Sequence, residues 1–107
     1  MVSTPGAMTQ SEIMDAHCAG ADFVKLFPAT TLGFTYIKDI LAPISHVKLV
    51  ATGGVTEENF GRYLDMGFAG AGISGRLADK KLMAEGNWAE ITRRARTFAA
   101  IAKGELR

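Results

Sequence analysis

Short apolar segments alternate with amphipathic segments along the whole chain. The predicted strands cover residues 23–27, 47–51 and 68–73, with a further stub before Pro5. The predicted helices cover residues of about 9–20, 35–41, 56–67 and 88–103. Strands that are apolar along their whole length and alternate with helices indicate a parallel sheet covered by helices.

Capping signals support the helix boundaries. Thr9 is followed three residues later by Glu12, the spacing of a capping box in which two orphan amide donors are satisfied reciprocally. Asn87 and Glu90 repeat this spacing before the last helix. Thr56 has a weaker partner in Asn59. Glycines are placed to end three of the helices, at Gly20, Gly67 and Gly104.

An internal repeat distinguishes two α/β architectures. Residues 4–9 and 51–56 share one layout, 47 residues apart. A barrel repeats its units around an axis, whereas an open doubly wound sheet reverses direction, so the repeat favours the TIM (βα)8-barrel family. A complete barrel needs roughly 250 residues. For this chain of 107 residues we expect an α/β half-barrel of about four βα units. A small open sheet is the alternative.

Composition limits the possible partners. The net charge is +1 and no basic run is present, so nucleic acid and anionic membrane surfaces are poor candidates. Cys18 is the single cysteine, which excludes an internal disulfide and fits a reducing compartment. The N-terminus does not resemble a signal peptide, and no apolar stretch is long enough to span a membrane. We expect a cytoplasmic protein.

Lys25 is the candidate catalytic residue. The side-chain period of a strand puts Phe23, Lys25 and Phe27 on one face and aliphatic residues on the other. In a barrel the lysine face lines the interior. An ammonium group there loses hydration, which favours the neutral amine that can attack a ketone. The alternative is a lysine at the end of a strand that extends its head into water.

A second lysine, Lys48, also has apolar neighbours. Barrel enzymes carry their active sites at the carboxyl ends of the strands. Lys48 lies four residues before Thr52, where its strand is predicted to end, whereas Lys25 lies three residues before Pro28. The position along the strand therefore favours Lys25.

Glycine-rich turns follow the last two predicted strands. They are Thr52-Gly53-Gly54 and the run from Gly70 to Gly75. Glycines let backbone amides approach an anion closely, and barrels of this kind often bind phosphate after their last two strands. A phosphate site is therefore predicted from the pair of turns. His17 and His46 have no partners at ligand spacing, so neither a metal nor another cofactor is predicted. Arg93, Arg94 and Arg96 are expected on the solvated face of the last helix.

Three runs of residues resemble a known family. They are Pro5-Gly6-Ala7-Met8-Thr9, Gly20-Ala21-Asp22-Phe23-Val24-Lys25-Leu26-Phe27-Pro28-Ala29 and Thr52-Gly53-Gly54-Val55. The sequence resembles the 2-keto-3-deoxy-6-phosphogluconate (KDPG) and 4-hydroxy-2-oxoglutarate (KHG) aldolases over essentially its whole length. The resemblance implies a class I aldolase on a (βα)8 barrel, usually a homotrimer. It also implies that residues 1–107 are the C-terminal half of the barrel domain.

The resemblance assigns roles to individual residues. Lys25 would form an imine with pyruvate or the keto-acid substrate, and Phe27 would pack against the methyl end of that substrate. Pro5 and Pro28 would shape the pocket, and the Thr52 hydroxyl would hydrogen-bond the substrate. The phosphate would be held by backbone amides of Gly53, Gly54, Gly72, Ile73, Ser74 and Gly75. The products would be pyruvate and an aldehyde, either glyceraldehyde 3-phosphate or glyoxylate.

The chain also departs from the family pattern. Relatives commonly read Gly-Val-Gly-Ser in the last loop, where this chain reads Gly72-Ile73-Ser74-Gly75. The resemblance also implies that the family's catalytic glutamate and its carboxylate-binding arginine lie in the first half of the barrel, outside this chain. The loss of a positioned base would slow proton transfer about 10²–10⁴-fold. Two alternatives to an active aldolase are therefore a non-catalytic half-barrel that folds by self-association and another phosphate-binding barrel, such as an epimerase.

Overall fold

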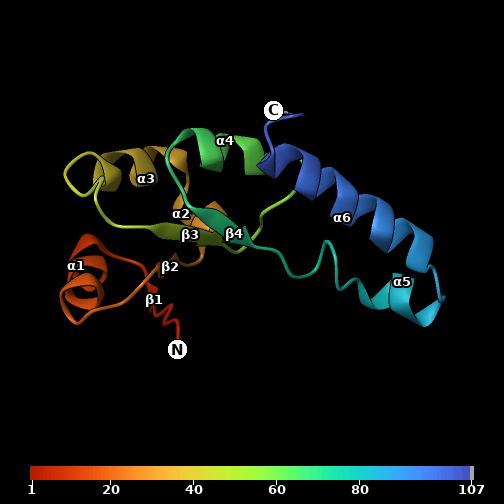
Figure 1. Cartoon of the computed structure of the whole chain (residues 1–107), viewed down its shortest axis with the longest axis horizontal. Helices are drawn as coiled ribbons and strands as arrows, with labels where there is room; N and C mark the ends of the chain where they lie inside the picture. The colour runs from red at the N-terminus through yellow and green to blue at the C-terminus, as the bar shows by residue number, and fades with distance from the viewer. Residues whose placement is uncertain (107) are drawn as a thin grey trace.

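The sheet of this protein is parallel throughout. The computed structural model describes residues 1–106 and contains one four-stranded sheet in the order β1-β2-β3-β4 (Figure 1). The strands are β1 (Gly6–Ala7), β2 (Val24–Leu26), β3 (Leu49–Thr52) and β4 (Gly70–Gly72). Each strand pairs in parallel with the next, as predicted. The predicted stub before Pro5 was wrong, because β1 follows the proline. Pro5 has no N–H to donate, and only its carbonyl joins the ladder, by accepting from the Lys25 amide at 2.8 Å.

Helices follow every strand. They are α1 (Gln10–Cys18), α2 (Ala29–Leu32), α3 (Phe34–Leu41), α4 (Phe60–Asp65), α5 (Lys80–Ala84) and α6 (Trp88–Ala102). The predictions for α1, α3 and α6 are confirmed within a few residues, whereas α2 and α5 were not predicted. The predicted start of α4 at Thr56 was wrong. Residues 57–59 form a turn before the helix. The Thr56 amide donates to Asn59 Oδ1 at 2.8 Å, so one half of the predicted Thr56–Asn59 cap is present.

The caps of the first and last helices differ. The capping box of α1 is confirmed, since Thr9 Oγ1 accepts from the Glu12 amide at 3.3 Å and Glu12 Oε1 accepts from the Thr9 amide at 3.0 Å. At α6 the Asn87 side chain accepts from the Glu90 amide at 3.3 Å. The Glu90 carboxylate binds Arg93 and Arg94. The predicted box at α6 is therefore only half formed.

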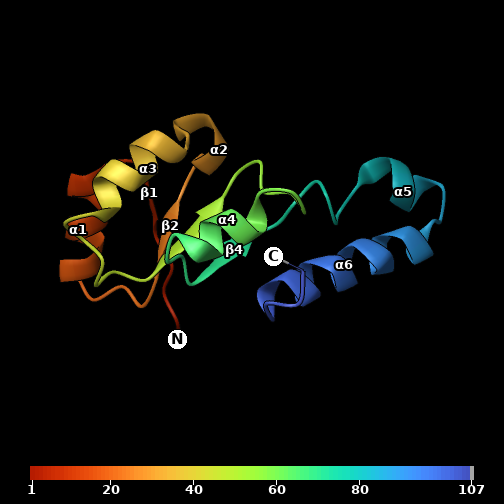
Figure 2. The same ribbon diagram turned by 90° about the horizontal axis from the view of Figure 1, so that it is seen from above.

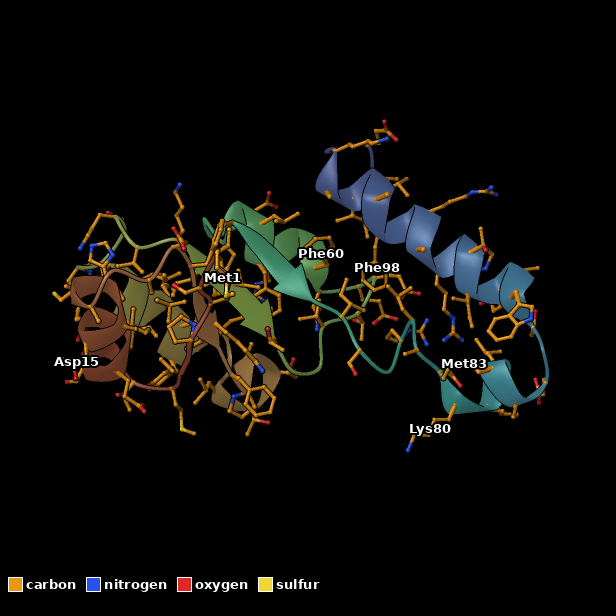
Figure 3. All side chains as sticks on the ribbon, turned by 60° about the horizontal axis from the view of Figure 1, so that its bottom comes forward. Met1, Asp15, Phe60, Lys80, Met83 and Phe98 are labelled. Carbon is orange, nitrogen blue, oxygen red and sulfur yellow. The ribbon has the colours of Figure 1, made fainter. Side chains whose placement is uncertain are left out.

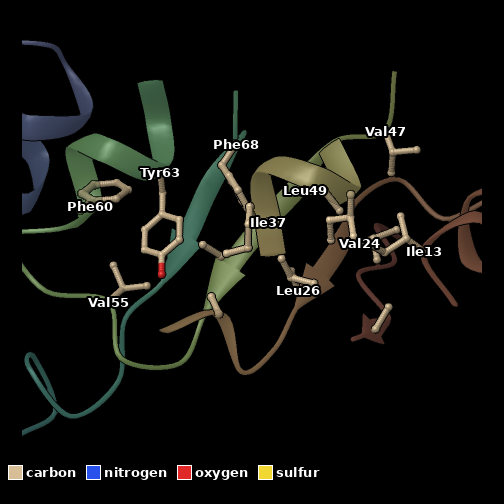
Figure 4. Close-up of a cluster of buried hydrophobic side chains, with 14 of the residues drawn as sticks. Ile13, Val24, Leu26, Ile37, Val47, Leu49, Val55, Phe60, Tyr63 and Phe68 are labelled. Atoms are coloured by element: carbon tan, nitrogen blue, oxygen red, sulfur yellow. The ribbon is translucent and has the colours of Figure 1, made fainter. Parts of the chain in front are cut away.

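The strand alternation separates a buried face from a more open one. Val24, Leu26, Leu49 and Ala51 are at most 1% exposed and pack against the helices. Figure 4 shows Val24, Leu26 and Leu49 together with two further buried residues, Ile37 of α3 and Tyr63 of α4. Full burial of one such aliphatic side chain contributes about 1.5–3 kcal/mol. Lys25 and Val50 occupy the opposite face and are only partly buried.

The last helix joins the rest of the fold through its second half. The rings of Phe60 in α4 and Phe98 in α6 meet with centroids 5.8 Å apart (Figure 3). α5 and the beginning of α6 extend beyond the sheet (Figures 1 and 2), and the principal extents of the molecule are 44 × 27 × 26 Å. Within residues 1–106, none of the helices has the length and apolar character needed to cross a membrane.

The turn after β3 depends on a missing side chain. Gly53 and Gly54 have φ angles of 101° and 74°, in the left-handed region that disfavours any residue with a Cβ. A Cβ built on Gly54 would lie 2.5 Å from Thr30 Oγ1. The Thr30 amide also donates to the Gly53 carbonyl at 3.1 Å. The β3–α4 turn is thus packed directly against α2.

Gly54→Ala is expected to destabilise the protein by roughly 1–3 kcal/mol, because the substitution combines a left-handed backbone with an overlap on Thr30. Urea unfolding followed by circular dichroism would measure the change. Gly70→Ala is the matched control, since Gly70 is not among the positive-φ glycines and its Cβ would meet nothing within 4 Å. Equal unfolding midpoints for the two variants would contradict the packing described for the turn.

Candidate active site

Lys25 occupies the centre of the open face of the sheet. It pairs in register with Gly6 of β1 and with Val50 of β3, so glycine and an aliphatic residue flank it. The side chain is partly buried. Its Nζ lies 4.9 Å from the centroid of the Phe27 ring, a cation–π distance. Phe27 is two residues further along, roughly 6.6 Å towards the carboxyl end. The ammonium group of Lys25 therefore extends towards the carboxyl ends of the strands.

The rival lysine lies elsewhere. Lys48 precedes the first residue of β3 and is exposed. Its Nζ is 5.9 Å from the Phe23 ring centroid. Lys48 thus lies at the amino end of the sheet, and Lys25 is the lysine nearer the carboxyl end.

A cavity of about 400 Å³ opens at the carboxyl ends of β2, β3 and β4. Most of the predicted substrate and phosphate residues line it together. The lining residues are Phe27, Thr52, Gly53, Gly54, Val55, Thr56, Gly72, Ser74, Gly75 and Arg76. Residues far apart in the sequence therefore meet at one site, because the carboxyl ends of parallel strands lie at the same edge of a sheet.

Close approach explains two of the glycines in this cavity. A Cβ on Gly53 would lie 3.2 Å from the Phe27 ring, and a Cβ on Gly72 would lie 3.0 Å from Thr52 Oγ1. The Phe27 ring therefore rests against the first glycine turn. The Thr52 hydroxyl lies over β4. Larger residues at either glycine would displace the two side chains that face the cavity.

Four of the predicted site residues do not line the cavity. Lys25 lies within β2, two residues before Phe27 of the cavity lining. The Pro5 carbonyl accepts from the Lys25 amide in the ladder. Pro28 is joined to Phe27 by a cis peptide bond, and its Cα would lie 3.2 Å from a Cβ built on Gly53. The Ile73 side chain packs against the hydrophobic core. Ile73 can therefore offer only its backbone to a ligand.

Two arginines at the site were missed or misplaced by sequence reasoning. Arg76 lines the cavity and binds Glu57, with Nε–Oε1 at 2.8 Å and Nη2–Oε2 at 2.6 Å. The expectation of a solvated Arg94 was wrong: its side chain is 14% exposed, and its Nη1 donates to the Arg76 carbonyl at 3.0 Å. The i,i+4 spacing of Glu90 and Arg94 was the one available sequence signal, because these two side chains also bind each other.

The carboxylates of this region are held in their charged form. Hydrogen bonds from Arg76 are the largest cause of a lowered pKa for Glu57. The Arg93 side chain, followed by Arg94, lowers the pKa of Glu90 to about 2. Hydrogen bonds from the amides of Leu82 and Lys81 and from Arg94 lower the pKa of Asp79. The ion pairs around the β4–α5 loop are therefore fully charged at neutral pH.

Comparison with known proteins gives a consistent result. The family model for KDPG and KHG aldolase matches residues 1–94. The 2-dehydro-3-deoxy-6-phosphogalactonate aldolase of Escherichia coli strain K12 is 41% identical over 78 residues, which cover 72% of this chain and 38% of that protein. The 2-dehydro-3-deoxy-phosphogluconate aldolase of Haemophilus influenzae is 34% identical over 101 residues, which cover 94% of this chain and 48% of that protein.

A solved structure agrees with these relatives. The native KDPGal structure superposes with a TM-score of 0.82 and 32% sequence identity, covering 98% of this chain and 50% of that chain. The chain thus spans half or less of the length of these relatives. The four-stranded parallel sheet with its helices is an α/β fold that matches part of a TIM-barrel aldolase. The chain belongs to the KDPG and KHG aldolase family.

Proposed function

We propose that the protein containing this chain is a class I, Schiff-base aldolase and that Lys25 is its nucleophile. The observation that carries the proposal is the position of Lys25. It lies on the open face of β2, one row below the cavity, with its Nζ 4.9 Å from the ring of Phe27, which lines that cavity. A carbonyl compound bound in the cavity would therefore lie close to a strand-mounted amine.

The chemistry needs no group other than this amine and a proton carrier. The neutral amine attacks the carbonyl carbon of a 2-keto acid, and loss of water from the adduct gives an imine. The proton carrier removes the proton of the hydroxyl group on the departing carbon, and the protonated imine accepts the electron pair released when the carbon–carbon bond breaks, so an aldehyde leaves and an enamine remains. Protonation of the enamine and hydrolysis of the imine then release pyruvate and regenerate Lys25. The Thr52 hydroxyl and the Phe27 ring would orient the keto acid.

The glycine turns favour a phosphorylated substrate. Backbone amides of Gly53, Gly54 and residues 72–75 would hold the phosphate, because both loops line the same cavity. We therefore propose 2-keto-3-deoxy-6-phosphogluconate or its galactonate isomer as substrate, cleaved to pyruvate and glyceraldehyde 3-phosphate. 4-Hydroxy-2-oxoglutarate, cleaved to pyruvate and glyoxylate, is the unphosphorylated alternative.

The domain context is also a proposal. Residues 1–107 would form the C-terminal half of a (βα)8 barrel in a cytoplasmic homotrimer. The first half would supply the catalytic glutamate and the carboxylate-binding arginine. The catalytic rate of the isolated chain would then be lower than that of the whole protein, by about 10²–10⁴-fold for the missing base alone.

Self-association of the isolated chain is a second candidate behaviour. β1 and β4 are the two edges of the sheet, and Phe27 on the open face is 49% exposed. Unpaired parallel edges and an exposed apolar face both favour association. Two copies of the chain could close one eight-stranded ring without any catalytic role.

The Schiff-base proposal predicts covalent trapping. Treatment of the full-length protein with pyruvate and sodium borohydride should attach a three-carbon adduct to Lys25, because reduction makes the imine irreversible. Peptide mass spectrometry locates the adduct. Lys25→Met should abolish labelling, whereas Lys48→Met, which removes the other strand-associated lysine, should retain it. An adduct on Lys48, or none on either lysine, would overturn the assignment.

The open sheet predicts the oligomeric state of the isolated chain. Sedimentation equilibrium should give a mass above the 11.4 kDa of one copy, since burial of the sheet edges and the open face favours pairing. Phe27→Ser should shift the equilibrium towards the single copy. Trp88→Ser, which replaces a 59% exposed aromatic at the start of α6, beyond the sheet, should leave it unchanged. A stable single copy at micromolar concentration would contradict obligate pairing.

A further inference from the structure

The cavity has one charged side chain among its lining residues. Arg76 follows the glycine run of β4 and lines the cavity with Gly54 of the β3–α4 turn. Its partner Glu57 belongs to the segment after that turn and reaches Arg76 through two hydrogen bonds of 2.8 and 2.6 Å. The ion pair therefore bridges the two loops in which a phosphate site was predicted.

Glu57 leaves part of the guanidinium group available. A guanidinium group has five N–H donors and two edges that can each bind an oxyanion in a bidentate manner. Glu57 takes the edge formed by Nε and Nη2. Among residues 1–106, no other acceptor is bound by the Arg76 side chain. The edge formed by Nη1 and the second Nη2 hydrogen can thus receive another oxyanion while Glu57 stays in place.

The backbone of Arg76 is also fixed. Its carbonyl accepts from Arg94 Nη1 at 3.0 Å. Arg94 is largely buried and binds Asp79 and Glu90 at 3.3 and 3.1 Å. Arg76 is therefore held at its carbonyl by α6 and at its side chain by Glu57. An arginine held at both ends loses little conformational freedom when it binds a ligand.

The ion pair between Arg93 and Glu90 differs from that between Arg76 and Glu57 in its position relative to the cavity. Arg93 binds Glu90 in the same bidentate manner, at 2.7 and 2.6 Å. Arg93 is 62% exposed on α6 and is not among the residues that line the cavity. Arg76 has the same chemistry, but lies at the rim of a cavity whose remaining polar groups are hydroxyls and backbone amides.

We propose that Arg76 is the residue by which the site selects a phosphate monoester over an unphosphorylated substrate, with Glu57 as its positioning residue. The proposal rests on the function proposed above, because it assigns the phosphate of the aldehyde portion to this cavity. The glycine amides alone offer hydrogen bonds without a formal charge. Arg76 adds a charge-assisted, bidentate contact that an uncharged aldehyde cannot make.

Direct phosphate binding provides the first test. Titration of the full-length protein with inorganic phosphate by calorimetry gives a dissociation constant for the wild type and each variant. Arg76→Met should weaken binding about ten- to hundredfold, the loss expected for a charge-assisted bidentate contact. Arg93→Met, which removes the same charge from a matched ion pair, should change binding by less than about twofold. Unchanged affinity in Arg76→Met, or equal losses in the two variants, would overturn the proposal.

Catalytic selectivity provides the second test. For condensation with pyruvate, Arg76→Met should lower kcat/KM for glyceraldehyde 3-phosphate by a clearly larger factor than kcat/KM for glyceraldehyde. An equal loss for the two aldehydes would show a structural effect and overturn the proposal. Arg76→Lys keeps the charge and can keep the pairing with Glu57. It should lose several-fold in phosphate affinity through the missing edge, and it decides the question if the methionine variant does not fold.

The two proposals can fail separately. Borohydride labelling of Lys25 by pyruvate should persist in Arg76→Met, because pyruvate carries no phosphate. If the wild type shows no label, the Schiff-base function fails, whereas the phosphate titration still decides the role of Arg76. If the label forms but phosphate binding is the same in the wild type and in Arg76→Met, only the inference about Arg76 is overturned.

Discussion

The register of β2 against β3 is the constraint on which the remaining features of the site depend. Val24 pairs with Leu49 and Leu26 with Ala51, so four aliphatic side chains meet the helices together. A slip of one residue would exchange the faces, exposing these side chains at about 1.5–3 kcal/mol for each of the larger ones and burying the Lys25 ammonium group at a cost of several kcal/mol. The hydrophobic effect that forms the sheet therefore also fixes the amine on the open face.

Much of this arrangement could be predicted from the sequence, because it follows from two simple periodicities. The side-chain alternation of β2 puts Lys25 and Leu26 on different faces of the sheet. The alternation of strands with helices requires parallel pairing. Parallel pairing in turn brings the carboxyl ends of β3 and β4 together. The two glycine turns could thus be predicted to line one site, as the cavity shows.

The remaining features depend on tertiary contacts that have no periodic signature. Arg76 and Glu57 are 19 residues apart, and neither side chain shows in the sequence that the other will be near. α2 and α5 have four and five residues, too few for a helical pattern to be recognised. The late start of α4 also lacks a periodic signature: the Thr56 carbonyl accepts from the amides of Asn59 and Phe60, at 3.3 and 3.0 Å, and residues 57–59 form a turn before the helix.

The helices on the outside of the sheet determine how rigid the loops of the site are. α4 begins a few residues after the Gly53-Gly54 turn, and its Phe60 packs on Phe98 of α6 at 5.8 Å. The same α6 carries Arg94, which holds the loop after β4 through the Arg76 carbonyl. Both loops are therefore attached to one pair of packed helices, and the bridge between Glu57 and Arg76 closes the connection. It follows that the separation of the two loops depends on the packing of α4 against α6 as well as on the glycines. A cavity that opened by moving one loop alone would have to break either the Arg94 contact or the Glu57 bridge.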